Sequence, residues 1–275
     1  MRVVLCILSL ILIASAASTA FALTTNAVER PNILVSLLSD VDKFSAGDTF
    51  RVGLKLVPDD EWHVYWRNPG DSGMPVSISW TLPEGVTAGD FHWPMPHKIP
   101  FGIFTNYGYE NEVILPSTFK VAENFSGEAV EIVGHATWLV CREQCIPGDA
   151  EIRFSLPLAE KSVPADEAAQ IAHYLEKEPK KLGLLSGSIE AGDKMTMELF
   201  AAIPAFKQAK HIEFFPVNES LFDASAEAKM FWKNNLVRIT QNKSDSFMSM
   251  PENVGGVLVV DHKQAWEFSF DQPGK

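Results

Sequence analysis

The stretch TFRVGLKL, residues 49–56, alternates between apolar side chains and residues that are polar or have no side chain. Successive side chains of a β-strand point to opposite faces of a sheet, so this alternation predicts a strand with one face on a core. Four apolar residues share that face: Phe50, Val52, Leu54 and Leu56. The stretch EIRFSLPL, residues 151–158, predicts a second such strand, whose inner face carries Ile152, Phe154, Leu156 and Leu158.

Short clusters of Gly, Pro, Asp and Ser separate the strand-like runs. They are SAGD (45–48), NPGDSG (68–73), LPEG (82–85), IPGD (146–149) and EAGD (190–193). Gly and Pro supply the backbone angles that tight turns require, and we expect a turn at each cluster. Many short strands joined by such turns predict an all-β fold built as a β-sandwich.

One segment has helical spacing. Its apolar residues recur every three or four positions, at Ala168, Ile171, Ala172 and Leu175. We expect Pro164 at the first helical position, Ser162 as a cap, and an end before Pro179, because Pro disfavours helix continuation. This segment predicts a short helical connector over residues 160–183.

The connector divides the sequence into two predicted β-domains. The first covers residues 23–159, and a second, smaller β-rich domain covers 184–275. The stretch EAGDKMTMELF, residues 190–200, repeats the Ala-Gly-Asp turn and the alternation of residues 46–56. The chain of 275 residues is also longer than one sandwich requires.

The first 22 residues have the layout of a secretory signal peptide. Arg2 precedes an apolar run, and small residues follow up to Ala20-Phe21-Ala22. This pattern predicts export to the periplasm with cleavage after Ala22. No later apolar stretch approaches the roughly 18 residues of a spanning helix, so we expect no membrane insertion of the mature chain.

The charge of the chain excludes some partners. Its formal net charge is −12, and its basic residues are not clustered. Nucleic acids and anionic membrane surfaces bind clustered Lys and Arg, so we expect neither as a partner. We also expect no cofactor.

Cys141 and Cys145 lie four positions apart in WLVCREQCIPG, residues 138–148, and the only other cysteine, Cys6, lies in the predicted signal peptide. A disulfide stapling so short a loop stabilises a protein by only about 2 kcal/mol on the chain-entropy estimate. Two cysteines supply half of a tetrahedral zinc site, or soft ligands for Cu(I), but no second pair accompanies them. Two close cysteines outside the cytosol also suit thiol-disulfide exchange, which needs a second thiol to resolve the mixed disulfide. These residues alone leave staple, metal site and redox pair open.

The stretch HWPMPH, residues 92–97, offers two histidines and a methionine. Imidazole and thioether groups both suit copper. The same stretch also reads as a proline-stiffened structural loop, which is the interpretation we favour.

Three longer stretches resemble one family. They are HVYWRNPGDSGMPVSISWTLPEG (63–85), FHWPMPHKIPFGIFTNYGYENEVILP (91–116) and WLVCREQCIPGDAEIRFSLPL (138–158). In this order they resemble the periplasmic N-terminal domain of the DsbD/ScsB-type thiol:disulfide interchange proteins, which are protein-disulfide reductases linked to cytochrome c biogenesis. The spacing of three residues between the cysteines looks more like the ScsB branch, which is linked to copper tolerance.

The resemblance implies a fold and an activity. The family domain is an immunoglobulin-like β-sandwich, whose cysteine pair takes electrons from a membrane-embedded thiol reductase and passes them to periplasmic thioredoxin-like proteins. By this resemblance Cys145 is expected to attack and Cys141 to resolve. A neighbouring loop shields the pair in the family, and the corresponding candidates here are Phe101, Phe104 and Tyr107.

One departure from the family bears on the function. We expect neither a transmembrane domain nor a C-terminal thioredoxin domain in this chain, so a separate membrane protein would have to reduce the pair. The alternative is a non-enzymatic copper-handling or docking module that has kept the sandwich.

Overall fold

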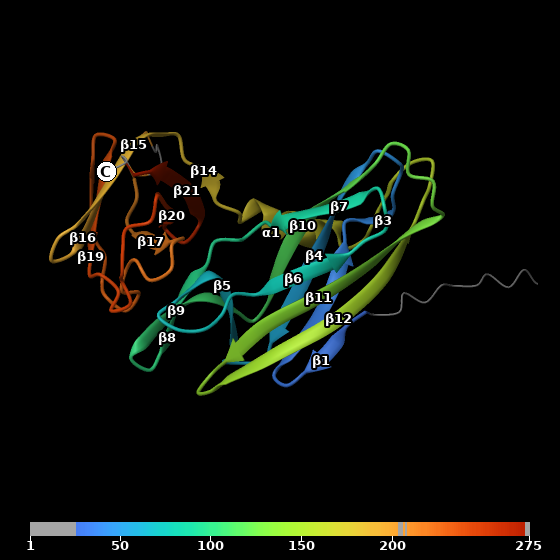
Figure 1. Cartoon of the computed structure of the whole chain (residues 1–275), viewed down its shortest axis with the longest axis horizontal. Helices are drawn as coiled ribbons and strands as arrows, with labels where there is room; N and C mark the ends of the chain where they lie inside the picture. Colours follow the sequence, from blue (N-terminus) through green and yellow to red (C-terminus); the bar gives the residue numbers. More distant parts are fainter. Residues whose placement is uncertain (1–25, 203–205, 207, 273–275) are drawn as a thin grey trace, which may run out of the picture.

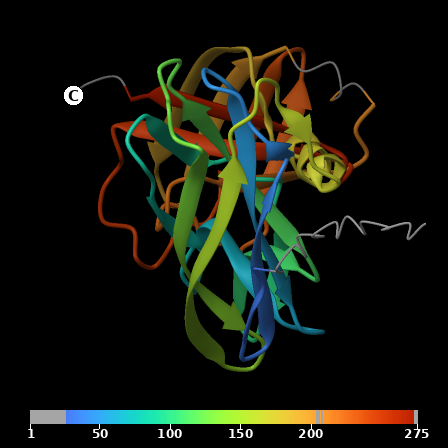
Figure 2. The same ribbon diagram turned by 90° about the vertical axis from the view of Figure 1, so that its right-hand side faces the viewer.

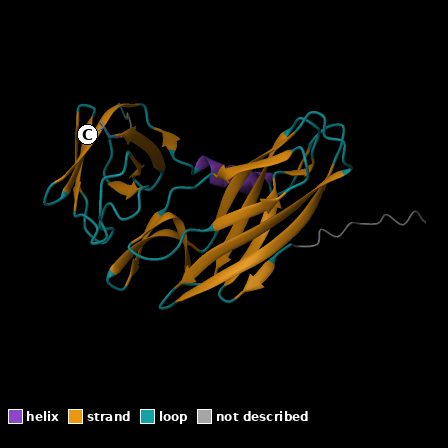
Figure 3. Ribbon diagram, in the orientation of Figure 1, coloured by secondary structure: helices purple, strands orange, loops and turns teal. Residues whose placement is uncertain are grey.

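The computed structural model describes residues 26–202, 206 and 208–272. The predicted signal peptide, residues 1–22, lies outside the described residues. The described chain is almost entirely β-structure, with a single helix, as Figure 3 shows. The all-β prediction is confirmed, and residues 28–157 form an immunoglobulin-like sandwich of two sheets (Figure 1).

The first sheet of the sandwich contains the stretch TFRVGLKL. In spatial order its strands are β1 (Val28–Arg30), β2 (Ile33–Ser39), β4 (Thr49–Pro58), β10 (Val113–Val121) and β7 (Val86–Phe91). Each neighbouring pair is antiparallel. The four apolar side chains predicted for the inner face of β4 are all buried: Phe50, Val52, Leu54 and Leu56.

The second sheet carries the cysteines. In spatial order its strands are β12 (Cys145–Pro157), β11 (Ala129–Cys141), β5 (His63–Gly70), β9 (Phe104–Glu110) and β8 (His97–Phe101), and β6 (Ser77–Thr81) pairs with β11 further along. The long hairpin of β11 and β12 presents Trp138, Ile152 and Leu156 to the core, while Phe154 and Leu158 are partly buried against it. The predicted inner face of residues 151–158 is therefore confirmed.

The expected turn at Pro147-Gly148 is wrong, because both residues lie inside β12. β12 is an edge strand, where the missing N–H of Pro is tolerated. Gly148 pairs with Trp138, and a methyl group at Gly148 would lie 2.6 Å from the indole. Gly is therefore needed here for a close approach of backbone and indole, not for a turn.

Helix α1 (Ala168–Glu176) covers the outer face of the first sheet, and Figure 2 shows it end-on beside the sandwich. Ile171 is buried there, and it packs over Gly53 of β4. The predicted start of the helix is wrong: Val163–Pro164 forms strand β13, which pairs with β3 (Val41–Lys43). Ser162 does not cap the helix, because its hydroxyl donates a hydrogen bond to Asp48.

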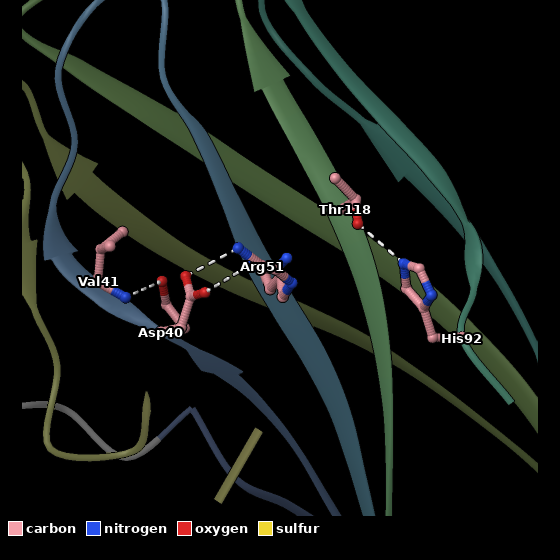
Figure 4. Close-up of polar contacts among 6 residues, drawn as sticks. Asp40, Val41, Arg51, His92 and Thr118 are labelled. Atoms are coloured by element: carbon pink, nitrogen blue, oxygen red, sulfur yellow. Dashed lines mark hydrogen bonds and ion pairs between the residues drawn. The ribbon is translucent and has the colours of Figure 1, made fainter. Parts of the chain in front are cut away.

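Polar contacts link neighbouring segments of the first sandwich (Figure 4). Asp40 accepts a hydrogen bond from the backbone N–H of Arg51, at 2.8 Å. His92, in the HWPMPH stretch, lies with Nε2 2.8 Å from Thr118 Oγ1, as Figure 4 shows. Its Nδ1 lies 3.0 Å from Glu178 Oε2. Both ring nitrogens of His92 are engaged within the protein, which favours the structural interpretation of this stretch.

Beyond the helix, two smaller sheets form a second β-rich unit. The strands of one are β14 (Lys180–Lys181), β21 (Gln264–Asp271), β20 (Asn253–Val260) and β17 (Ile212–Pro216), and those of the other are β15 (Leu184–Ala191), β16 (Met195–Ala201), β19 (Leu236–Gln241) and β18 (Lys229–Lys233). The unit has its own core, which includes Met195, Met197, Leu199, Phe214 and Leu258. The alternating residues of the stretch 190–200 lie in β16, which contributes Met195, Met197 and Leu199 to this separate core. The domain boundaries themselves stay a prediction.

The two units are in contact through apolar and polar groups. Phe215 of β17 packs against Trp66 and Tyr107, with ring centroids 6.3 and 5.2 Å away. The Asn68 amide donates to the carbonyl of Pro216, at 2.8 Å. The second unit is therefore packed against strands β5 and β9, of which β5 neighbours the cysteine-bearing strand β11. Among the described residues, no helix has the length and hydropathy to cross a membrane.

Candidate redox site

Cys141 and Cys145 close the tip of the β11–β12 hairpin. Cys141 is the last residue of β11, Cys145 is the first of β12, and the two are direct Cα partners. They form a disulfide with the Cα atoms 4.2 Å apart. The three intervening residues form the turn, in which the N–H of Arg142 donates to the carbonyl of Gln144. The pair therefore projects at one end of the sandwich, the end at which the β8–β9 hairpin also lies (Figure 1).

The two sulfur-bearing residues differ in exposure. Cys141 is fully buried, whereas Cys145 is exposed. Disulfide exchange proceeds by attack of a thiolate on one sulfur, and the attacked sulfur has to be accessible. The geometry therefore makes Cys145 the accessible sulfur and Cys141 the leaving sulfur when an external thiolate attacks.

Tyr65 of β5 reaches both sulfur atoms. Its hydroxyl donates a hydrogen bond to Cys141 Sγ at 2.9 Å and lies 3.6 Å from Cys145 Sγ. The Tyr65 ring is buried, and burial raises the pKa of its hydroxyl to about 12. Tyr65 is thus neutral at physiological pH and able to donate to a thiolate, which a hydrogen-bond donor stabilises relative to the thiol.

Two more buried polar residues support Tyr65. The Asn106 amide donates to the Tyr65 hydroxyl at 3.3 Å and lies 3.4 Å from His63 Nε2. His63 is the β5 partner of Cys141, and burial lowers its pKa to about 4. The imidazole is therefore neutral at physiological pH. The disulfide is surrounded on its buried side by groups that form hydrogen bonds without carrying charge.

The predicted turn NPGDSG begins inside β5, which ends at Gly70, and a glycine just beyond the strand lets the backbone cover Tyr65. Gly73 has a φ of +105°, and a methyl group there would lie 2.1 Å from Cε1 of the Tyr65 ring. Only a residue without a side chain allows the backbone to approach the ring so closely. Gly73 thereby allows the backbone to pack directly on the Tyr65 ring.

The predicted shield residues occupy different places. Phe101 and Phe104 face each other across the β8–β9 hairpin, and the Phe101 ring lies 6.1 Å from that of His63. Phe104 is 43% exposed. Tyr107 is buried and packs against Phe215 of the second unit. The structure thus brings Phe101 next to the polar neighbours of the pair, and the shielding roles stay a prediction.

Sequence reasoning missed His63, Tyr65 and Asn106. On the same strand as His63 and Tyr65, Trp66 packs in the core. Strand alternation places His63 and Tyr65 on the face opposite Val64 and Trp66, so the sequence did carry a signal. A histidine and a tyrosine at alternate positions of an otherwise apolar strand indicate a buried polar network on that face.

The charged residues in the turn itself are engaged at the surface. The Arg142 guanidinium forms an ion pair with Glu61 at 3.0 Å, and both side chains are largely exposed. Exposed ion pairs contribute little, typically below about 1 kcal/mol. We therefore expect the buried neighbours of the cysteine pair to influence its chemistry more than Arg142 does.

Residues 35–157 match the family described as the thiol:disulfide interchange protein DsbD, N-terminal. This segment contains both cysteines and most of the three stretches that carry the resemblance. The resemblance of the first domain to this family is therefore confirmed. No curated protein matches the chain.

Among solved structures, the N-terminal periplasmic domain of ScsB from Proteus mirabilis is similar, with a TM-score of 0.68 and 19% sequence identity. The match covers 91% of this chain and 98% of that chain, so the shared fold extends into the second unit. A conserved domain protein from Bacillus anthracis matches over 89% of each chain at 12% identity, but its TM-score of 0.27 is too low to support an argument.

Proposed function

We propose that this protein is a periplasmic thiol-disulfide exchange protein that relays electrons through Cys141 and Cys145. In this proposal a membrane-embedded thiol reductase reduces the pair, and the reduced pair then reduces periplasmic thioredoxin-like proteins. The observation that carries the proposal is the unequal disulfide at the hairpin tip: Cys145 is exposed, while Cys141 is buried and accepts a hydrogen bond from Tyr65. The family of the first domain supports it.

Reduction of the pair proceeds in two exchange steps. A donor thiolate attacks Cys145 Sγ, the bond between the two sulfurs breaks, and Cys141 leaves as a thiolate to which Tyr65 donates its hydrogen bond. The second thiol of the donor, as a thiolate, then attacks the donor sulfur of the mixed disulfide and releases Cys145. Two electrons have moved to the pair, and the donor has become a disulfide.

Transfer to the partner runs in the opposite sense. The Cys145 thiolate attacks the partner's disulfide, and the partner's leaving sulfur takes a proton. Cys141 then attacks Cys145 Sγ, which restores the internal disulfide and releases the reduced partner. Because the two cysteines are directly opposed at the hairpin tip, Cys141 reaches Cys145 without a change in strand pairing.

Reduction by a thioredoxin-like donor tests this proposal. The oxidised mature chain is mixed with a catalytic amount of reduced thioredoxin, its reductase and NADPH, and free thiols are counted by alkylation and intact mass. We expect both cysteines of the chain to be alkylated, with no change in a Cys141→Ser/Cys145→Ser double variant. A pair that stays oxidised while the same mixture reduces insulin would contradict the proposal.

The domain organisation is proposed to serve the same function. In this proposal the exchange domain is residues 23–159, the connector is residues 160–183 and the β-rich domain is residues 184–275. Phe215 of the last packs directly against Trp66 and Tyr107 of the first. The hydroxyl of Ser225 in the second unit lies within hydrogen-bond distance of the carbonyl of Ile103, at the tip of the β8–β9 hairpin, and of the Asp71 carboxylate. This contact supports a role for the second unit in holding the proposed shield in place.

A further inference from the structure

Three side chains of the second unit converge near the β20–β21 turn, away from the cysteines. Glu213 lies in β17, His211 precedes it by two residues, and His262 lies in the turn between β20 and β21. β17 and β20 are paired antiparallel, with Ile212 opposite Val260. This pairing places the start of β17 beside the turn and brings the two histidines onto adjacent backbone segments.

The potential ligand atoms are close together. His262 Nδ1 lies 2.9 Å from Glu213 Oε2, and His211 Nε2 lies 3.9 Å from Glu213 Oε1. All three ligand atoms fall within 4.8 Å of one another. Ligand atoms that bind Zn²⁺ tetrahedrally at about 2.0–2.1 Å from the ion lie about 3.3 Å from one another. The observed distances of 2.9 and 3.9 Å lie on either side of this value.

The backbone holds this arrangement before any ion binds. Asp261 Oδ1 accepts hydrogen bonds from the N–H groups of Lys210 and His211, at 3.0 and 2.9 Å. The N–H of Asp261 in turn donates to the carbonyl of His211 at 3.0 Å. Asp261 and His262 both have positive φ, at +50° and +55°, a conformation in which Asp and His are enriched among residues other than Gly. The turn is therefore bound tightly to the segment that carries His211.

The donor set and its exposure favour one class of ion. Two imidazoles and one carboxylate suit Zn²⁺, Ni²⁺ and Cu²⁺, whereas Mg²⁺ and Ca²⁺ require a shell of oxygen atoms. The side chains of His211 and His262 are 56% and 60% exposed, and that of Glu213 is 18% exposed. An ion arriving from solvent can reach the imidazoles without local unfolding, while the carboxylate is held in place.

We propose that His211, Glu213 and His262 form a binding site for a divalent transition-metal ion such as Zn²⁺. The ion takes two nitrogen ligands and one oxygen ligand from the chain, and water fills its remaining positions. Lys98 of β8 lies within electrostatic range of Glu213, and its positive charge weakens cation binding.

Calorimetric titration with Zn²⁺ tests this site. The mature chain is used without a histidine tag and with the disulfide intact, so that the thiols cannot bind metal. We expect one Zn²⁺ per chain, and at least about tenfold weaker binding in His211→Ala and in His262→Ala. The exposed His135 of β11 supplies the matched control: His135→Ala should bind Zn²⁺ as the unaltered chain does.

A conservative variant protects the test against misfolding. Glu213→Gln keeps the shape of the side chain and removes its charge, so it too should weaken binding at least about tenfold. Mg²⁺ should give no binding heat at the same concentrations. Absence of Zn²⁺ binding to the unaltered chain, or binding that all three variants leave unchanged, would overturn the proposal.

Discussion

The redox site of the first unit and the histidine cluster of the second are both assembled at strand ends, but they differ in the burial and the charge of their polar residues. The polar residues behind the disulfide, His63, Tyr65 and Asn106, are buried. In the cluster, His211 and His262 are largely exposed and pair with a charged carboxylate. A buried, neutral environment suits a disulfide that exchanges through one accessible sulfur atom. An exposed cluster suits an ion that arrives from solvent.

The comparison predicts where substitutions have large effects. Around the disulfide, each buried group depends on its neighbours. Water cannot reach a buried group that has lost its hydrogen-bond partner, and close packing leaves no space for an added atom. At the surface, solvent replaces a lost partner at little cost. Changes behind the disulfide should therefore alter stability and exchange, while changes to the charged side chains on its exposed side should alter neither strongly.

The largest effect is expected for Gly73→Ala. The added methyl group meets the Tyr65 ring and the residue must keep a φ of +105°, so we expect a loss of about 3 kcal/mol in unfolding free energy. Urea denaturation of the oxidised proteins measures it. Gly102→Ala is the matched control: Gly102 also has positive φ, at +63°, but open space around it, and should cost only about 1 kcal/mol. Equal losses in the two variants would show that the contact with Tyr65 contributes nothing.

The next effect is a dependence of stability on pH. Burial lowers the pKa of His63 from 6.5 to about 4, so between these values the unfolded chain binds more protons than the folded chain. Stability from this group is complete above pH 6.5 and is lost as the pH falls toward 4. We expect a contribution of about 2.5 kcal/mol to disappear between pH 7.5 and 4.5.

Unfolding free energies at the two pH values measure this change. In His63→Gln the group no longer titrates, so the difference between pH 7.5 and 4.5 should shrink by the same amount. An unchanged pH dependence in His63→Gln would show that the buried imidazole is not its source.

A smaller effect is expected for Tyr65→Phe. Loss of the hydroxyl removes the donor to Cys141 Sγ, and hydrogen bonds to charged groups contribute about 1.5–3 kcal/mol. We expect the exchange rate with reduced thioredoxin to fall about tenfold, while the fold is retained. Tyr174→Phe is the control, because the Tyr174 hydroxyl donates to the Glu112 carbonyl, outside the redox site. If both variants exchange at the unaltered rate, Tyr65 does not assist the leaving sulfur.

The smallest effect is expected for Arg142→Gln. The ion pair with Glu61 is exposed on both sides, so its loss should change the unfolding free energy by less than about 0.5 kcal/mol. The exchange rate should change by about twofold or less. A large fall in the exchange rate would show that the charge of Arg142, on the exposed side of the cysteine pair, controls the exchange.

Much of the fold was predictable from local patterns. The alternation at residues 49–56 and 151–158 identified strands and their buried faces, because strand periodicity depends on backbone geometry alone. Pro147-Gly148 and Pro164 misled the prediction. Pro147-Gly148 was expected to form a turn and Pro164 to begin a helix. Instead, all three residues lie in strands: an edge strand tolerates the prolines, and the close approach of the Trp138 indole leaves room only for glycine at position 148.

The site was predictable only in part. The cysteines stood out by their spacing, but their buried neighbours became visible only once strand pairing placed His63 opposite Cys141. Alternation shows which side chains share a face and leaves open what covers that face. The same limit concealed the histidine cluster, since only the pairing of β17 with β20 brings His262 beside Glu213.

Trapping of mixed disulfides tests the central claim, that exchange runs through the exposed Cys145, most directly. Cys141→Ser and Cys145→Ser are each incubated with a thioredoxin-like protein whose exposed cysteine is activated as a mixed disulfide with thionitrobenzoate, and covalent complexes are quantified by non-reducing electrophoresis. We predict abundant complex with Cys141→Ser, which keeps the exposed cysteine, and little with Cys145→Ser. The reverse order, or equal yields from the two variants, would contradict the account.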